Sequence, residues 1–291
     1  MFRWCYGPYR TRRKMNQLRR NAFVTGASSG IGRAVARKLL KEGYCVWGTS
    51  RSVARLKALD SDLNFHAIAF DLDDGDGAVA SYRTAQAAAE GGFEIVVNNA
   101  GYGVFEEFDL AAFELWEKQI QAMLITTLRV MREQVIDLKS RGGGTLVNVS
   151  SLATEFPLPY TSGYNVAKAG LSAMSESLLM ELAPTAVRVI DFRPGDFRTD
   201  FNVAMTRQSP THSPAAANER MAGAWAALEA NFDNAPEVEM AAHDLFMAVA
   251  RKRQGVVRSG DFFQTRLAPL FERLMPLRWA RAVRWHYFGL K

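Results

Sequence analysis

Residues 22–32 of the chain read AFVTGASSGIG. The apolar start of this stretch predicts a buried strand, and its glycine-rich turn leads into the helical pattern of residues 30–42. Glycines allow a backbone to come close to bound phosphate, and a helix start offers free N–H groups and the positive end of a dipole. The stretch therefore predicts a pyrophosphate site. A Walker-type site is excluded, because Ile31 and Gly32 stand where Lys and Ser or Thr would be required.

A second pattern combines a phenol, an amine and a hydroxyl. Tyr164 and Lys168 are four residues apart, and Ser151 lies thirteen residues before Tyr164. If residues 162–182 are helical, Tyr164 and Lys168 project from one face, and the ammonium would lower the phenol pKa from its ordinary value of ~10. Such a phenol can exchange a proton with a substrate while Ser151 holds the substrate oxygen. Alone, a Tyr-x-x-x-Lys pair is more typical of a solvated helix surface, so this interpretation depends on the neighbouring motifs.

Two further predicted strands end in polar residues. The apolar residues 93–97 lead into the sequence NNAG at 98–101, and residues 145–149 lead into Ser150 and Ser151. Ligands of open α/β sheets bind beyond the carboxyl ends of the strands. We therefore expect these segments and the glycine turn to share one edge of a sheet.

Residues 20–200 resemble the short-chain dehydrogenase/reductase family. The resemblance rests on four motifs that occur in this order: the glycine turn, NNAG, the Ser-Tyr-Lys set and the Pro-Gly pair at 194–195. The resemblance implies a seven-stranded parallel sheet flanked by helices. It implies Tyr164 as the acid/base, Lys168 on the nicotinamide ribose and Ser151 orienting a carbonyl.

The resemblance also implies a cofactor site. Residues 194–199 are expected to pack against a nicotinamide, with Thr199 near its carboxamide, and Asp71 is expected to face the adenine. The expected cofactor-binding residues are Gly26, Ser28, Ser29, Gly30, Ile31, Gly32, Ser50, Arg51, Asp71, Asn98, Ala100, Gly101, Tyr164, Lys168, Pro194, Gly195 and Thr199.

The end of the second predicted strand, residues 44–49, indicates which cofactor is used. An acidic residue there would accept the ribose hydroxyls of NAD(H) and repel a 2′-phosphate, but Ser50 and Arg51 follow instead. Because Arg pairs bidentately with phosphate oxygens, the sequence favours NADP(H), with NAD(H) as the alternative. The competing interpretation makes Arg51 a solvated loop charge.

One position departs from the family pattern. The family places an Asn midway along the helix before the Ser strand, where its backbone holds a water in the proton relay to Lys. Met123 occupies that position, and residues 104–146 contain no Asn. Met offers no comparable hydrogen bond. We expect a slower or pH-shifted enzyme rather than an inactive one.

The alternation of elements predicts an α/β fold: a three-layer doubly wound parallel sheet of Rossmann type in a single domain. Residues 20–260 are expected to form that domain, with a lid at about 199–235. The expected strands are 22–25, 44–49, 65–70, 93–98, 144–149 and 187–192, and the expected helices are 30–42, 52–60, 76–90, 111–139 and 162–182. By resemblance, the last two helices would form the interface of a homodimer or homotetramer, although packing against the sheet alone would also explain them.

Composition agrees with one soluble domain. The chain has 291 residues, is 48% hydrophobic and contains no internal repeat. Cys5 and Cys45 exclude a disulfide framework and fit a reducing cytoplasm. The histidines lack metal-ligand spacing, so we expect no metal.

The net charge of +6 is concentrated at the two ends. Residues 1–19 form a basic extension, expected to be disordered, with a transit peptide as the less favoured alternative. The middle of the chain is net negative and lacks a basic stripe with interleaved aromatic residues, so nucleic-acid binding is not expected.

The predicted lid carries large apolar side chains at the mouth of the site. They are Phe201, Val203, Met205, Met221 and Trp225, and the opposite loop carries Phe156, Leu158 and Tyr160 close by. These residues suit a hydrophobic ketone or alcohol, or they simply pack the lid on the core.

Residues 261–291 are expected to form a basic amphipathic extension. After Pro276, the residues Arg278, Arg281 and Arg284 recur at helical spacing with aromatic residues between them. Docking on its own domain or on another subunit is favoured over contact with an acidic membrane.

Two functions remain at this stage. The first is an NADP(H)-dependent oxidoreductase that interconverts a carbonyl and an alcohol, with Tyr164 as acid/base. The second is an NADP-binding regulatory or sensor protein with weak or no turnover. The intact Ser151, Tyr164 and Lys168 favour the enzyme, because a sensor has no need of a tuned phenol.

Overall fold

The computed structural model describes residues 20–57, 59, 61–199, 201, 205 and 219–290. The basic extension 1–19, including Cys5, lies outside the described residues. So do Val203 and most of the predicted lid between residues 200 and 218.

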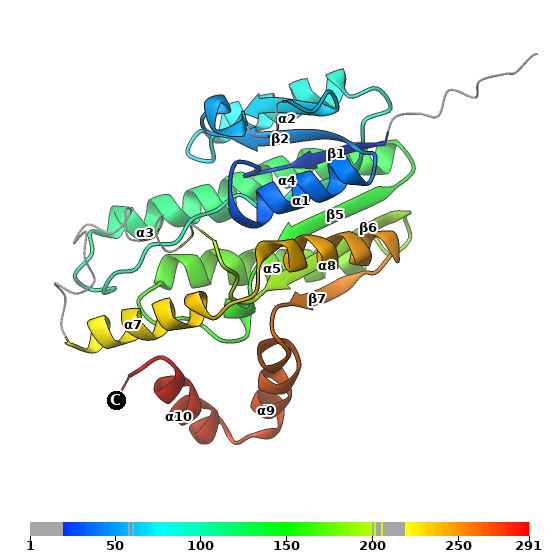
Figure 1. The fold of residues 1–291 in the computed structure, drawn as a ribbon. Helices are drawn as coiled ribbons and strands as arrows, with labels where there is room; N and C mark the ends of the chain where they lie inside the picture. The colour runs from blue at the N-terminus through cyan, green and yellow to red at the C-terminus, as the bar shows by residue number, and fades with distance from the viewer. Residues whose placement is uncertain are drawn as a thin grey trace, which may run out of the picture.

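Within the described residues, seven strands form one parallel sheet in the order β3-β2-β1-β4-β5-β6-β7 (Figure 1). The strands are β1 (Asn21–Val24), β2 (Cys45–Ser50), β3 (Phe65–Ala69), β4 (Phe93–Asn98), β5 (Gly144–Val149), β6 (Val187–Pro194) and β7 (Gly255–Ser259). The order reverses between β1 and β4, and such a switch point creates a crevice at the carboxyl ends of the strands.

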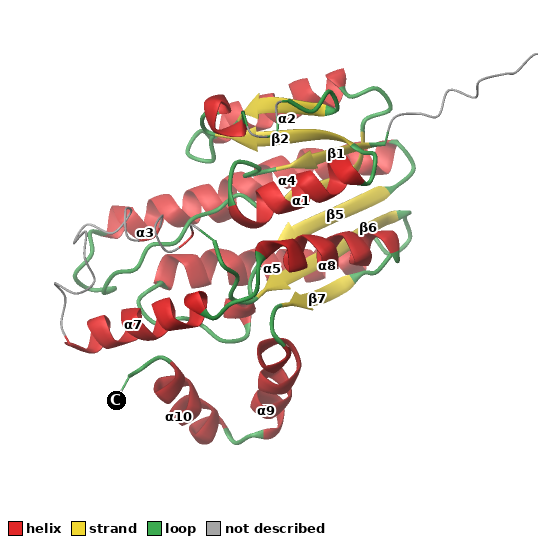
Figure 2. Cartoon of the chain, viewed as in Figure 1, coloured by secondary structure: helices red, strands yellow, loops and turns green. Residues whose placement is uncertain are grey.

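Helices cover both faces of the sheet, which gives three layers (Figure 2). One face carries α1 (Gly30–Lys41) and α8 (Val238–Ala250), and the other carries α2 (Gly75–Ala88), α4 (Thr127–Ser140) and α5 (Ser162–Glu181). Side chains of β1 alternate between the two cores: Ala22 and Val24 enter the first, and Phe23 enters the second. The predicted doubly wound α/β architecture is confirmed.

Each expected strand is present within a residue or two of its expected bounds, because the apolar runs of a parallel sheet are buried on both faces. The expected helix at 52–60 is only the short 3-10 turn η1 (Val53–Leu56). The sequence did not place α8 or the seventh strand by residue number.

The expected single helix at 111–139 is interrupted. The structure has α3 (Phe113–Ile120), then a π-helical segment, η2 (Gln121–Thr126), and then α4. Met123 lies in the middle of the π-helical turn. Such turns insert one extra residue into a helix and often occur at functional sites.

The helix α7 (Glu219–Asp233) comes between β6 and α8. After β7 the described chain continues in the π-helical η5 (Phe263–Leu267), α9 (Ala268–Leu274) and α10 (Leu277–Tyr287). In Figure 1, α9 lies below β7 and α10 lies below α7, and the two helices form a hairpin. α10 begins after Pro276 as expected. Among the helices described, none has the length and apolar character needed to cross a bilayer.

Candidate active site

A cavity of about 940 Å³ lies along the carboxyl ends of the strands. It brings together most of the residues that the sequence singled out. The expected residues that line it are Gly26, Ser28, Ser29, Gly30, Ile31, Ser50, Arg51, Asp71, Ala100, Gly101, Ser151, Tyr164, Lys168, Pro194, Gly195 and Thr199.

The glycine turn forms one wall of this cavity. Gly26 and Gly30 have φ angles of 69° and 49°, which glycine adopts at little cost. The first turn of α1 contains no acidic side chain, so no carboxylate there opposes a bound phosphate. Thr25 Oγ1 accepts hydrogen bonds from the N–H groups of Asn99 (2.9 Å) and Ala100 (3.0 Å), which ties the end of β4 to the turn.

Asn98 and Gly32, two residues expected at the cofactor, do not line the cavity. The Asn98 amide donates to Gln134 Oε1 (2.8 Å) and Asn148 Oδ1 (2.9 Å) inside the protein. Gly32 packs so tightly that an added Cβ would collide with the carbonyl oxygen of Gly26. The structure therefore gives both residues a supporting role behind the cavity wall.

Ser151, Tyr164 and Lys168 meet inside the cavity. Lys168 Nζ lies 5.8 Å from the centre of the Tyr164 ring, and the side chains of Tyr164 and Ser151 are hydrogen-bonded. Ser151 Oγ also accepts from the N–H of Ala153 (3.0 Å) at the start of the 3-10 turn η3 (Leu152–Thr154). That bond fixes the Ser151 hydroxyl beside the phenol.

The protonation state of Tyr164 differs from our expectation. Burial raises the pKa of Tyr164 to about 12, the Ser151 hydrogen bond lowers it, and the nearby Asp196 raises it further. The prediction that Lys168 brings this pKa below its ordinary value is wrong for the protein alone, because burial of the phenolate is the larger effect. Tyr164 is therefore a protonated phenol at neutral pH, which suits a general acid.

Lys168 is the buried cation of the site. It is 5% exposed, and its Nζ donates to the carbonyl oxygen of Val149 (2.7 Å) at the end of β5. Burial lowers the pKa of Lys168 to about 8, while the negative charge of Asp191 raises it. The pKa of Lys168 therefore lies close to physiological pH, so small changes around the amine alter how much of it is charged.

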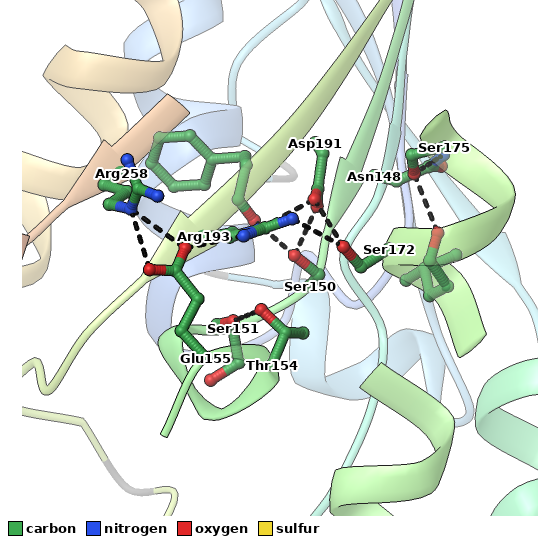
Figure 3. A network of polar contacts seen from close by, with 12 residues as sticks. Asn148, Ser150, Ser151, Thr154, Glu155, Ser172, Ser175, Asp191, Arg193 and Arg258 are labelled. Carbon is green, nitrogen blue, oxygen red and sulfur yellow. Dashed lines mark hydrogen bonds and ion pairs between the residues drawn. The ribbon is translucent and has the colours of Figure 1, made fainter. Parts of the chain in front are cut away.

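Asp191, on β6, is the centre of the polar network in Figure 3. Its carboxylate accepts hydrogen bonds from Ser150 Oγ, Ser172 Oγ (2.7 Å) and Arg193 Nε (2.8 Å). Arg193 in turn pairs with Glu155 (2.6 Å). Ser150 adjoins Ser151, and Ser172 is on the same helix as Lys168, so the network joins the two elements that carry the catalytic candidates.

Met123 lies directly behind the cavity wall. It is 3% exposed, and its Sδ is 3.5 Å from the N–H of Tyr102, which donates to it. Its terminal methyl is so close to Gly101 that a Cβ there would be 2.9 Å away. Lys168 Nζ would be 3.7 Å from the same point. Met123 therefore fills space beside Lys168 without offering it a side-chain oxygen or nitrogen.

The opposite end of the cavity is more polar. Ser50, Arg51 and Asp71 line it, together with Arg55 on η1 and Asp73. Arg51 and Arg55 are both exposed and lie four residues apart beyond the end of β2. The two guanidinium groups stand there beside the carboxylates of Asp71 and Asp73, and either guanidinium has the geometry to pair with a 2′-phosphate.

The apolar residues of the predicted lid and of the loop opposite it divide into two groups. Phe156, Leu158 and Phe201 line the cavity, as expected for a substrate wall. The others pack into a small core beside the cavity: Tyr160, Met205, Met221 and Trp225, with Phe105 and Leu228. Phe201 also packs against this core, and Leu228 also lines the cavity. The residues of the second group therefore pack the lid on the protein, which was the alternative to lining the substrate pocket.

The C-terminal extension supplies a wall that the sequence did not predict for the site. Gln264 Nε2 donates to Asp196 Oδ2 (2.6 Å), and Gln264 Oε1 accepts from the Asp196 N–H (3.1 Å). Gln264 also bonds Tyr287 Oη (3.3 Å), which links α10 to the loop after Pro194. Phe271 and Met275 line the cavity from the same hairpin. A single Gln in a remote helix carries no sequence signal for such a role.

The chain belongs to the short-chain dehydrogenase/reductase family, because residues 20–210 match the family model described as short chain dehydrogenase. It is an NAD(P)-dependent oxidoreductase acting between carbonyl and alcohol groups. Over 190 residues it is 35% identical to serine 3-dehydrogenase of Agrobacterium fabrum, covering 63% of this chain and 74% of that one. It is 32% identical to a probable NADP-dependent dehydrogenase of Haemophilus influenzae, covering 60% and 70% of the two chains.

Solved structures share the fold. A short-chain dehydrogenase from Streptomyces avermitilis superposes with a TM-score of 0.75 at 24% identity, covering 94% of this chain and 97% of that one. The closed form of serine dehydrogenase complexed with NADP⁺ gives a TM-score of 0.69 at 24% identity, with 83% and 94% covered. At these identities the likeness concerns the fold.

Proposed function

We propose that this protein uses NADP(H) to interconvert a hydrophobic carbonyl compound and its alcohol. The convergence of Ser151, Tyr164 and Lys168 in one cavity with the glycine turn carries this proposal. When bound, the nicotinamide supplies or accepts the hydride. The residues present fit such a cofactor, since the cavity joins an end that carries Arg51 and Arg55, a glycine turn and a buried acid/base set.

In the reduction direction, the Tyr164 hydroxyl gives its proton to the carbonyl oxygen. The Ser151 hydroxyl holds the same oxygen, and the Lys168 ammonium favours the phenolate that remains. A protonated Tyr164 with a pKa near 12 is ready for this role throughout the neutral range. In the oxidation direction the phenolate must form first, so alkaline solution should favour that direction.

Preference for NADP(H) depends on Arg51 in this proposal. Arg51→Ala should raise KM for NADPH by about 10- to 100-fold, the effect of losing charge-assisted hydrogen bonds to phosphate. KM for NADH should change far less, because NADH lacks the 2′-phosphate. Steady-state kinetics with both cofactors measure this. Arg37→Ala, which removes an exposed Arg of α1 that does not line the cavity, is the control. Equal changes in KM for NADPH and NADH would show that Arg51 does not recognise the 2′-phosphate.

Met123 should limit turnover. Met123→Asn should raise kcat by about 2- to 10-fold or shift its pH profile. One added amide hydrogen bond beside Lys168 contributes a free energy that corresponds to about this change in rate. Met123→Leu keeps the volume without the amide and should leave kcat and its pH dependence unchanged. Identical kinetics for the parent and the Asn variant would show that the position plays no part in proton transfer.

The apolar wall of the cavity supports a hydrophobic substrate. Phe156, Leu158, Phe201 and Phe232 line it with the aromatic residues of the C-terminal hairpin. A medium-chain methyl ketone and its alcohol should therefore have a higher kcat/KM than serine, the substrate named for the bacterial relative. A preference for serine would contradict the hydrophobic assignment while leaving the oxidoreductase assignment intact.

The sensor remains the second candidate, and Met123 is the observation that favours it. A sensor would bind NADPH but oxidise it with no carbonyl of a broad panel, and Tyr164→Phe would not alter its behaviour. Carbonyl-dependent loss of the reduced-nicotinamide absorbance would exclude the sensor.

A homodimer or homotetramer in the cytoplasm is also part of the proposal. Ile125 in η2, Ile136 on α4 and Val166 and Met180 on α5 are exposed, which suits an interface on these helices. Light scattering of the purified chain would measure its mass in solution, and a monomer would contradict this assignment.

A further inference from the structure

The hairpin of α9 and α10, residues 268–287, exposes several large apolar side chains on its outer side. Leu270, Leu274, Trp279 and Trp285 are each more than half exposed. Arg278 and Arg281 are exposed among them. Large apolar side chains exposed on one helix hairpin are typical of a contact surface.

The inner side of the same hairpin contacts the rest of the protein in part, and Phe271 on that side is still 51% exposed. Phe288, directly after α10, is 5% exposed, and Tyr287 and Gln264 hold the hairpin to Asp196. Phe271 and Met275 form part of the cavity wall. The expected docking on the protein's own domain therefore accounts for one face and leaves the other without a partner in the described part of the chain.

We propose that this outer face docks on the surface of an anionic lipid bilayer. An interfacial helix combines Trp and Leu, which enter the headgroup region, with arginines that attract acidic lipids. α10 has this composition: residues 277–287 contain two Trp, three Arg and no acidic residue. With 3.6 residues per turn, Arg278, Arg281 and Trp285 lie within about 60° of one another around α10, and Trp279 lies to one side of them.

A second copy of the chain fits this face less well. A symmetric contact with its two-fold axis beside α10 would place α10 of one copy against α10 of the other. Arg278 and Arg281 would then face the same arginines, and α10 offers no carboxylate to neutralise them. Like charges opposed in an interface cost several kcal/mol. An anionic bilayer supplies the missing negative charge.

Docking would also place the cavity close to the lipid, because the hairpin is both the docking surface and a cavity wall. A water-insoluble ketone could then enter from the bilayer. This consequence rests on the proposed function, whereas docking itself can be measured without catalysis, so the two can fail separately.

Vesicle sedimentation of the full chain tests the proposal. Vesicles of phosphatidylcholine mixed with phosphatidylglycerol should bind the protein, and vesicles of phosphatidylcholine alone should bind it weakly. The double variant Arg278→Gln, Arg281→Gln should lower the partition coefficient for the anionic vesicles by about 30-fold. Each Arg near an anionic surface strengthens binding by about fivefold, and the variant removes two of them. Neither residue lines the cavity, so activity on a soluble carbonyl should not change.

A matched variant separates this surface from general positive charge. Arg251→Gln with Arg253→Gln removes two exposed arginines near the amino end of β7, away from the hairpin, and should bind vesicles like the parent. Equal losses in both double variants, or no loss in the hairpin variant, would overturn the proposal. So would a parent dimer that the hairpin variant converts to monomer, because that result assigns the face to a second copy.

Discussion

Tyr164→Phe should lower kcat for carbonyl reduction by about 10²- to 10⁴-fold, the range that general acid catalysis contributes. The substitution removes one oxygen that bonds Ser151 and leaves the ring, which packs edge-on against Phe201 with centroids 5.7 Å apart. Binding of NADPH, measured by fluorescence titration, should change little. The loss should therefore appear in kcat, and stopped-flow absorbance measures it.

Tyr160→Phe is the natural control, because Tyr160 lies four residues earlier and does not line the cavity. It should keep near-parent kcat. A Tyr164→Phe enzyme with more than about a tenth of parent kcat would fall outside the range for a general acid and contradict the assignment.

Asp191→Asn should lower the free energy of unfolding by about 3 kcal/mol, because it removes one partner of a buried ion pair. Asp191 and Arg193 are largely buried, and two Ser hydroxyls donate to the same carboxylate. Urea unfolding measures the change. Glu237→Gln is the matched control, since Glu237 pairs with Arg198 at an exposed site and its loss should cost less than about 1 kcal/mol.

The same variant should also alter the pH dependence of activity. Asp191 raises the pKa of Lys168, which burial has lowered to about 8. Without that negative charge the pKa falls, so the ammonium is lost at lower pH. The alkaline limb of kcat/KM should therefore move to lower pH in Asp191→Asn, and Arg193 and Glu155 of the same network stay in place. An unmoved limb with intact folding would confine Asp191 to a structural role.

The sheet and the core of the site could be predicted because each depends on local signals. The apolar runs at β1, β4 and β5 define buried strands, and the residues that directly follow them must lie at one edge of a parallel sheet. Ser151, Tyr164 and Lys168 therefore converge as their spacing implies.

The remainder depends on long-range packing that local patterns do not encode. Met221 and Trp225 look like pocket residues in the sequence but pack in the small core beside the cavity with Phe105, more than a hundred residues away. Gln264 reaches Asp196 from the C-terminal extension only because β7 brings it back to the site. The raised pKa of Tyr164 follows from burial, which the i,i+4 spacing with Lys168 cannot reveal.

The most direct test of the account uses NADPH that carries deuterium at the transferable position of the nicotinamide. With a hydrophobic ketone, mass spectrometry should find the deuterium on the carbinol carbon of the alcohol, and Tyr164→Phe should suppress its formation. A protein that binds NADPH tightly but transfers deuterium to no carbonyl compound of a broad panel would contradict the account.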